Sequence, residues 1–172
     1  METTGTPSRS GLVRVRTVGY WICTGLIAQE MVAGAFWDFL HIEFVRVVFA
    51  HLGYPLYLLV ITGVWKIPCA VVLMLPRFLR LKEWAYAGAV FLYTGAAASH
   101  MFAGDRAGKW SGPLVFALFT LGSWALRPHT RRLTASEPPP KPTLRGWLVP
   151  AAVLGVMTIV GLVTIPQGPP PP

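Results

Sequence analysis

The chain has 172 residues, of which 53% are hydrophobic and only 13% are charged, about half the charged share of a typical soluble domain. Its formal net charge of +8 would ordinarily raise nucleic acid as a partner. The cations, however, are spread between long apolar segments, and no segment combines a basic patch with an aromatic platform. We therefore expect no nucleic-acid partner and a molecular surface that faces lipid.

Five apolar stretches follow one another along the chain, each near the roughly 20 residues that a helix needs to cross a bilayer. They cover about residues 17–39, 55–76, 84–104, 111–126 and 147–166. The third and fifth contain no charged residue, and the fourth is the shortest. We predict an all-α fold: an integral membrane helical bundle with a four-helix core over 17–126 and a fifth C-terminal transmembrane helix over 147–166.

Polar segments separate and flank these stretches. A short basic segment covers 1–16, a proline-rich basic linker 127–146 and a proline-rich tail 167–172; such compositions favour exposed, extended chain. The first apolar stretch has an alternative interpretation, a cleaved signal peptide, because Ala33–Phe36 offers small residues for cleavage. The 16 residues ahead of that stretch and Glu30 within it argue against cleavage.

The lysines and arginines alternate between the predicted loops. If the N-terminus lies in the cytoplasm, eleven of the 15 fall in inside segments. Three fall in outside segments (Arg46, Arg106 and Lys109), and Lys66 lies within a span. This distribution follows the positive-inside rule. It predicts a cell-membrane protein with a cytoplasmic N-terminus and an outside C-terminus.

Two blocks of the sequence carry a family likeness. The first, "HLGYPLYLLVITGVWKIPCAVVLMLPRFLRLKEWAYAGAVFLYTGAAASH", covers 51–100, and the second, "YWICTGLIAQEMVAGAFWDF", lies in the first stretch. Together they resemble the DoxX-like family of small membrane proteins over about 18–125. The resemblance implies a four-helix membrane bundle and no single activity. Some relatives are subunits of quinone-linked sulfur oxidation, some accompany redox-defence complexes, and one assists receptor assembly.

Ionisable side chains within a span are costly and rare, so each is a candidate functional residue. Lys66 lies about 15 Å, Glu30 about 20 Å and His100 about 24 Å from the cytoplasmic ends of their helices. Because consecutive helices are neighbours, we expect Glu30 and Lys66 to form an ion pair. That pair has two interpretations: a structural contact that fixes helix orientation, or a charged pocket for a lipid-soluble ligand or a proton transfer. A lysine that snorkels to the interface is a third.

The helix around Lys66 favours the pocket. Pro68 cannot donate a hydrogen bond to the carbonyl of Val64, and Gly63 is close by, so we expect a kink there. His100 could act as an acid–base partner or as a hydrogen-bonding residue near the outer interface. Both interpretations stay open.

Two further patterns carry less chemistry. Asp38, His41, Glu43 and His51 could ligate a divalent metal, but nothing in their spacing fixes them together, and we expect no metal site. Cys23 and Cys69 lie at similar predicted depths and could form a thiol pair, although small buried apolar residues are the simpler interpretation. The sequence indicates no cofactor.

Three functions remain. The first is an accessory protein or subunit of a membrane complex, plausibly quinone- or redox-linked. The second is a membrane enzyme on a lipid-phase substrate, of the isomerase or epoxide hydrolase type. In it Glu30 would be the base and His100 the acid, and Lys66 would set their charge states. The third is an assembly factor for a membrane protein. The expected partners are the lipid bilayer and either a membrane protein or a quinone- or lipid-like ligand.

Overall fold

The computed structural model describes residues 9–133 together with Leu144, Leu148 and Ala152, and every regular element in them is helical. The helices are α1 (Arg9–Phe39), α2 (Glu43–His51), α3 (Tyr57–Met74), α4 (Leu79–Phe102), α5 (Ala107–Leu126) and the short 3-10 helix η1 (His129–Arg131). The all-α prediction is therefore confirmed. The chain divides into two compact units, 1–133 and 134–172, and the first is described below. Apart from those three residues, the predicted fifth transmembrane helix and the tail lie outside the described residues.

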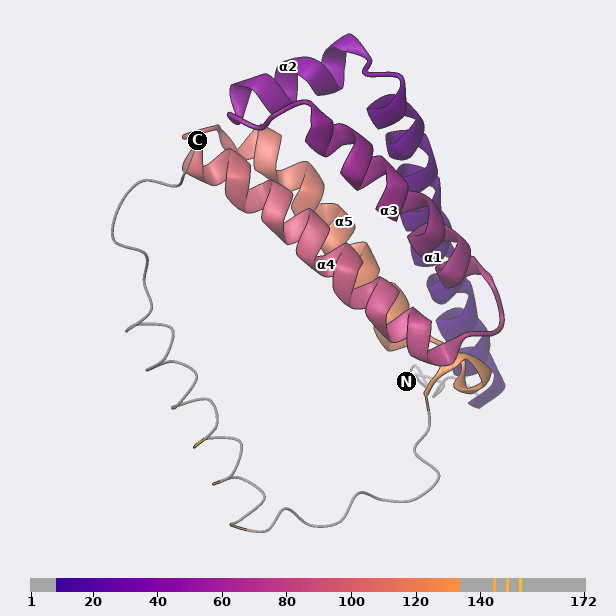
Figure 1. The fold of residues 1–172 in the computed structure, drawn as a ribbon. Coiled ribbons are helices and arrows are strands. Elements are labelled where there is room, and N and C mark those ends of the chain that lie inside the picture. Colours follow the sequence, from indigo (N-terminus) through magenta and orange to yellow (C-terminus); the bar gives the residue numbers. More distant parts are fainter. Residues whose placement is uncertain (1–8, 134–143, 145–147, 149–151, 153–172) are drawn as a thin grey trace, which may run out of the picture. The chain divides into compact units, whose positions relative to one another are not determined.

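Four long helices build the first unit (Figure 1). Because the connections are short, each helix runs antiparallel to the one before it. Helix α1 packs against α3 and α5, and α4 packs against α5 and, more loosely, against α3. Helix α2 lies across the end of the bundle where α1 finishes and α3 begins. The sequence predicted a loop between these two spans, so helix α2 was not expected.

The long helices differ from the predicted spans mainly at their ends. Helix α1 begins eight residues before the predicted 17 and α4 begins five before the predicted 84. The added first turns of α4, "LRLKE", contain strong helix formers that are not all apolar. Hydropathy therefore locates the membrane-compatible part of each helix rather than the whole helix.

Small residues bring the helices together in the core. Ala28, Ala70, Ala89 and Ala117 are each at most 8% exposed and come from the four long helices. Around them pack larger buried side chains, Ile27, Met31, Leu73, Tyr86 and Tyr93. Small interfacial residues allow backbones to approach closely, which is the main source of helix association where lipid removes the hydrophobic drive.

The end of the bundle that holds the start of α1 is strongly basic. The Lys82 ammonium is fully buried and donates to the carbonyls of Val72 and, at 2.8 Å, Leu73. Arg131 donates to the carbonyl of Met74 at 3.1 Å. These cations satisfy the orphan carbonyls in the last turn of α3 and complement the negative end of its dipole. The predicted linker 127–146 thus begins with packed residues, because η1 carries Arg131 onto the bundle.

Two further arginines cap α5 at the same end. Arg16 and Arg132 each donate to the carbonyl of Ala125 at 3.1 Å. Arg127, only 5% exposed, forms an ion pair with Glu83, which also accepts a bond from the Trp124 indole at 3.0 Å.

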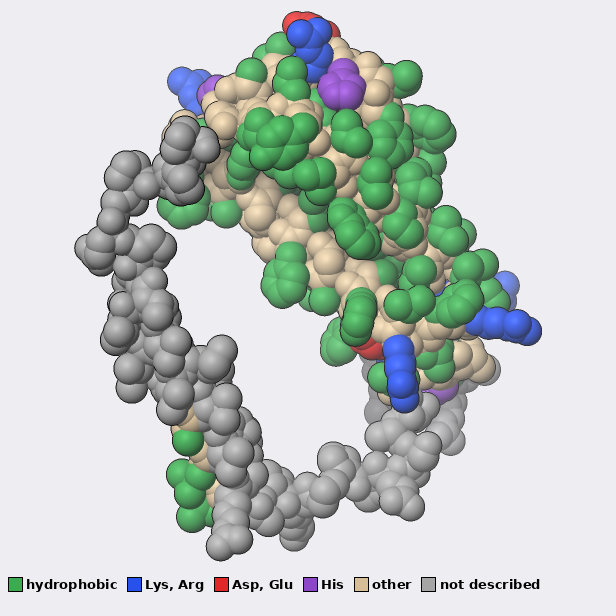
Figure 2. Space-filling view, viewed as in Figure 1, with side chains coloured by type: hydrophobic (Ala, Val, Ile, Leu, Met, Phe, Trp, Pro, Cys, Tyr) green, Lys and Arg blue, Asp and Glu red, His purple; other side chains and the backbone are tan. Residues whose placement is uncertain are grey.

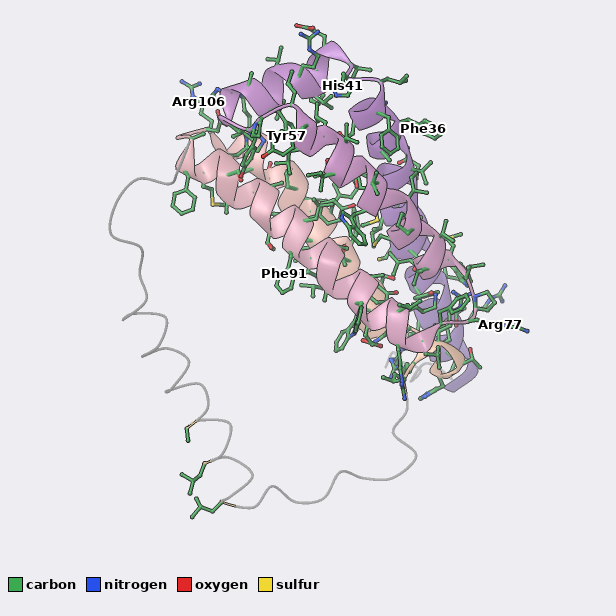
Figure 3. The ribbon with its side chains drawn as sticks, viewed as in Figure 1. Phe36, His41, Tyr57, Arg77, Phe91 and Arg106 are labelled. Atoms are coloured by element: carbon green, nitrogen blue, oxygen red, sulfur yellow. The ribbon has the colours of Figure 1, made fainter. Side chains whose placement is uncertain are left out.

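Many large apolar side chains are exposed on the bundle, and Figure 2 shows apolar side chains spread over the face in view. Among the described helices, α3 is long and apolar enough to cross a membrane by length and composition, with a mean hydropathy of 1.9 and only 22% of its span buried. Figure 3 shows Phe36 and Phe91 projecting away from the bundle, and Arg77 and Arg106 at opposite ends of it. Exposed apolar area on this scale marks a surface that meets lipid or another protein.

Candidate functional site

A cavity of about 520 Å³ lies inside the bundle next to α2. Helix α2 contributes Phe44, Val48 and Phe49 to its wall, and the long helices contribute the rest. Its polar lining residues are Gln29, Glu30, Thr62, Lys66, Tyr93, His100 and Lys109. The three residues singled out in the sequence, Glu30, Lys66 and His100, therefore line one cavity.

The ion partner of Lys66 is Asp38. Lys66 Nζ lies 2.9 Å from Asp38 Oδ2, and the two side chains are only 13% and 4% exposed. Thr62 donates a second hydrogen bond to the same oxygen at 3.1 Å. The expected ion pair between Lys66 and Glu30 is not formed, because Asp38, about two turns nearer to α2, is the partner of Lys66 instead.

Glu30 remains a neighbour of this pair. A Cβ added at Gly34 would lie 2.9 Å from Lys66 Nζ and 3.1 Å from Glu30 Oε1. Glu30, Gly34 and Asp38 are spaced four residues apart and so form one stripe along α1. The glycine leaves the room into which the Lys66 ammonium extends. This spacing was visible in the sequence and is the signal by which Asp38 could have been found.

Tyr93 on α4 supplies the partner of Glu30. Its hydroxyl donates to Glu30 Oε2, and its ring stacks on Phe116 of α5 with centroids 5.5 Å apart. Tyr93 and His100 lie seven residues apart, about two turns of α4. The tyrosine thus extends the polar lining from Glu30 towards His100.

His100 is held by Asp105, which the sequence analysis did not single out. Gly104 adopts a left-handed conformation with φ 76°, and its N–H donates to the carbonyl of Met101. The Asp105 N–H donates to the carbonyl of His100 at 3.0 Å. This is a Schellman motif, and it folds Asp105 back over the helix end. Asp105 Oδ2 then lies 2.7 Å from His100 Nδ1.

Asp105 also joins other elements to this helix end. His51 Nε2 at the end of α2 lies 3.0 Å from the Asp105 carboxylate, and Lys109 Nζ on α5 lies 3.2 Å from it. The hydrogen bond with His100, then those with Lys109 and His51, lower the pKa of Asp105 to about 2. An ionised Asp105 therefore fastens α2 to α4 and α5 at neutral pH.

Comparison with known proteins gives one match. The model of the DoxX-like family matches residues 22–123. The chain belongs to the DoxX-like family. That family is membrane-associated, in agreement with the apolar exterior of the bundle. No curated protein and no solved structure gave a significant match.

In this DoxX-like protein the matched region contains the polar residues of the cavity. Glu30, Asp38, Lys66, Tyr93 and His100 all lie within residues 22–123. Asp105 and Lys109 lie within it as well. The resemblance found in the sequence over about 18–125 therefore corresponds closely to the matched segment.

In the part of the chain that the structure describes, the other candidates from the sequence form neither a thiol pair nor a metal site. Cys23 and Cys69 are both free thiols, and the Cys69 thiol lies 3.4 Å from the carbonyl of Ala85. Asp38 is used by Lys66, and His41 Nδ1 lies 3.0 Å from the carbonyl of Phe39. Among the described residues, no three His, Cys, Asp or Glu side chains are grouped to hold a metal ion.

The cavity of the DoxX-like bundle offers both donors and acceptors to a ligand. Lys66 gives one of its three N–H groups to Asp38, which leaves two. The Glu30 carboxylate has further lone pairs beside the bond from Tyr93. Because Asp105 occupies Nδ1 of His100, that ring presents Nε2 as its other polar atom. These groups suit a small head group that both accepts and donates hydrogen bonds.

Proposed function

We propose that this protein is a multi-pass membrane protein whose internal cavity binds the polar head of a lipid-soluble, quinone-like ligand. It would do so as a small subunit or accessory of a membrane complex. The observation that carries the proposal is the cavity itself, in which Glu30, Lys66, Tyr93 and His100 line one space of about 520 Å³. Ligand sites typically combine mostly apolar walls with a few convergent polar groups.

The proposal includes the predicted topology, with the N-terminus in the cytoplasm. The basic end of the bundle, where Arg16, Lys82 and Arg131 cap helix ends, would then lie inside, as the positive-inside rule requires. The cavity would lie towards the outside. Single cysteines at Arg77 and Arg106 in sealed vesicles test this orientation: a membrane-impermeant maleimide added outside should label only the one at Arg106.

The ligand proposal is tested by binding a decyl ubiquinone analogue to the protein in nanodiscs. Quenching of tryptophan fluorescence reports binding, since Trp37 lines the cavity. In Gly34→Ala the new methyl group would take the space of the Lys66 ammonium, and we expect Kd to rise at least tenfold. Gly25→Ala on the same helix meets nothing within 4 Å and should bind as the wild type does. Equal binding by both variants would refute the proposal.

The subunit part of the proposal has a separate test. Native mass spectrometry of the protein extracted directly into nanodiscs should detect a membrane protein in fixed stoichiometry. That partner should remain bound in Gly34→Ala, because the substitution lies inside the bundle. If the protein is extracted as a single chain with no protein partner, the subunit part of the proposal fails and ligand binding alone remains as the proposed function.

A second candidate function is an enzyme that moves a proton on a lipid-phase substrate, of the isomerase or epoxide hydrolase type. The pairing of His100 with Asp105 favours it, because a carboxylate at Nδ1 orients a histidine for acid–base work. Glu30 would act as the base and His100 as the acid. The test is deuterium exchange next to the carbonyl of dodecan-2-one in nanodiscs made with heavy water. Exchange should fall at least a hundredfold in Glu30→Gln, and exchange equal to that of empty nanodiscs would exclude this probe reaction.

A further inference from the structure

An apolar groove of about 480 Å³ runs along the bundle between α3 and α4. Trp65, Pro68 and Val72 line it on α3, and Leu81, Trp84 and Gly88 line it on α4. Its polar lining residues are Thr62 and Lys66 alone. The groove occurs where two neighbouring helices pack most loosely, and it opens on the outside of the bundle, where Trp65 and Trp84 are 71% and 77% exposed.

The groove and the polar cavity meet at shared residues. Thr62, Lys66 and Leu92 line both. Lys66 therefore stands at the junction, with its ammonium held by Asp38 at 2.9 Å. A molecule with its head in the cavity would reach the groove directly past Lys66.

The length and volume of the groove match a single hydrocarbon chain. Its lining on α3 extends from Ile61 to Val72, which is about 16 Å along the helix. That length suits an extended chain of roughly twelve carbon atoms. Its volume over that length corresponds to a mean cross-section of roughly 30 Å², which is room for one chain and not for two side by side.

The charges at the cavity select an uncharged head. The acidic groups in and around it are Glu30, Asp38 and Asp105, and the basic ones are Lys66 and Lys109. Both basic groups already have an acidic partner, Lys66 in Asp38 and Lys109 in Asp105. An anionic head such as a phosphate would therefore lie beside the Glu30 carboxylate and be repelled in a low-dielectric site. A neutral head with a carbonyl or hydroxyl could instead accept from Lys66 and donate to Glu30.

From these observations we propose that the groove between α3 and α4 holds the single apolar chain of a neutral amphiphile whose head occupies the cavity. This inference rests on the proposed function and extends it, since it names the ligand class as a neutral head on one apolar chain. The chain would enter sideways from the bilayer, so that Trp65 and Trp84 flank it. Binding would then discriminate against two-chain phospholipids, which are the bulk of any membrane.

Photolabelling in phosphatidylcholine nanodiscs tests this inference. A dodecyl ubiquinone analogue with a diazirine at the end of its chain should label Val72, Leu81 and Trp84, which line the end of the groove away from Lys66. Excess unlabelled analogue should reduce that labelling at least fivefold. Gly88→Leu fills the groove and should reduce it similarly, whereas Gly95→Leu on the same helix lies outside it and should not. If Gly88→Leu fails to fold, Val72→Trp blocks the groove from α3.

The outcomes separate the two proposals. The groove inference is overturned if labelling is spread evenly over exposed residues such as Phe91 and Leu118 and is unchanged by the competitor. A second analogue with the diazirine beside the ring reports the head. If it labels Tyr93 and Phe116 while the chain probe labels at random, ligand binding stands and the groove inference fails. If it labels nothing in the cavity, the proposed function itself fails.

Discussion

Lys66 Nζ on α3 lies 2.9 Å from Asp38 Oδ2 on α1, and both side chains are almost fully removed from the surface. The pair forms where α1 and α3 pack together and where the cavity and the groove meet. A buried ion pair costs desolvation that its attraction only partly offsets, so its worth lies more in fixing geometry than in stability. Here it holds the ammonium of Lys66 beside Glu30 without joining the two.

Breaking the pair on one side should destabilise the protein strongly. Asp38→Asn removes the ion partner of the buried Lys66 ammonium, and we expect a loss of about 3 kcal/mol in the free energy of unfolding. The double variant Asp38→Leu with Lys66→Met removes both charges and should recover at least half of that loss. Denaturant unfolding in mixed micelles measures both.

The exposed pair between Glu43 and Arg46, 3.7 Å apart, serves as the control. Glu43→Gln should change stability by no more than about 0.5 kcal/mol. If the double variant at Asp38 and Lys66 is no more stable than Asp38→Asn, the loss of stability does not come from breaking this ion pair on one side.

Gly63 is predicted to be a packing requirement. A Cβ at this position would lie 2.8 Å from Phe39 Cε1, so the ring at the end of α1 would have to move. Because Phe39 is 40% exposed, the ring has room to shift outward, and Gly63→Ala should cost only about 1–2 kcal/mol. Gly25→Ala has open space and should gain up to about 1 kcal/mol from helix propensity. Thermal unfolding of the two variants should therefore move in opposite directions.

Lys82 is predicted to stabilise the end of α3. Its ammonium donates to the carbonyls of Val72 and Leu73, and Lys82→Met would leave both without this donor, at a cost of about 2 kcal/mol. Arg80→Met on the same turn is exposed and should be nearly neutral. Stability curves at pH 7 compare the two, and equal effects would contradict the capping role.

The pH dependence of Lys82 tests the cost of burying its charge, separately from the capping role. Burial, and then the nearby charges of Arg131 and Arg127, lower its pKa to about 8, against about 10.4 in the unfolded chain. Between these values the unfolded state binds more protons than the folded state, so stability should rise with pH. The advantage of the wild type over Lys82→Met should therefore grow from about pH 8 to about pH 10.4.

Asp105 should stabilise the fold at neutral pH and lose that effect in acid. Its pKa is about 2 in the folded protein, chiefly because of the hydrogen bond with His100, against about 3.9 when unfolded. The contribution is thus complete above about pH 4 and disappears as the pH falls towards about 2. The difference in Tm between the wild type and Asp105→Asn should shrink over that interval. A difference that is constant from pH 5 to pH 2 would contradict an ionised Asp105.

The sequence predicted the parts of this protein that depend on local composition. The four long helices follow from apolar runs of sufficient length, and Glu30, Lys66 and His100 were found because charged or polar side chains are conspicuous in such runs. The resemblance to the DoxX-like family, carried by contiguous blocks, was confirmed by the match to residues 22–123. Helix α2 was not predicted, because its nine residues are too few to give a transmembrane signal.

Only the tertiary structure decided which polar groups meet. Asp38 rather than Glu30 pairs with Lys66, since Gly34 leaves room for the Lys66 ammonium and the Tyr93 hydroxyl donates a hydrogen bond to Glu30. Asp105 reaches His100 because the chain reverses at Gly104 with a positive φ. Hydropathy records how deep a residue lies along its own helix and carries no information on rotation about that axis. The rotation is set by packing between helices, and it determines the partner of every charge inside this bundle.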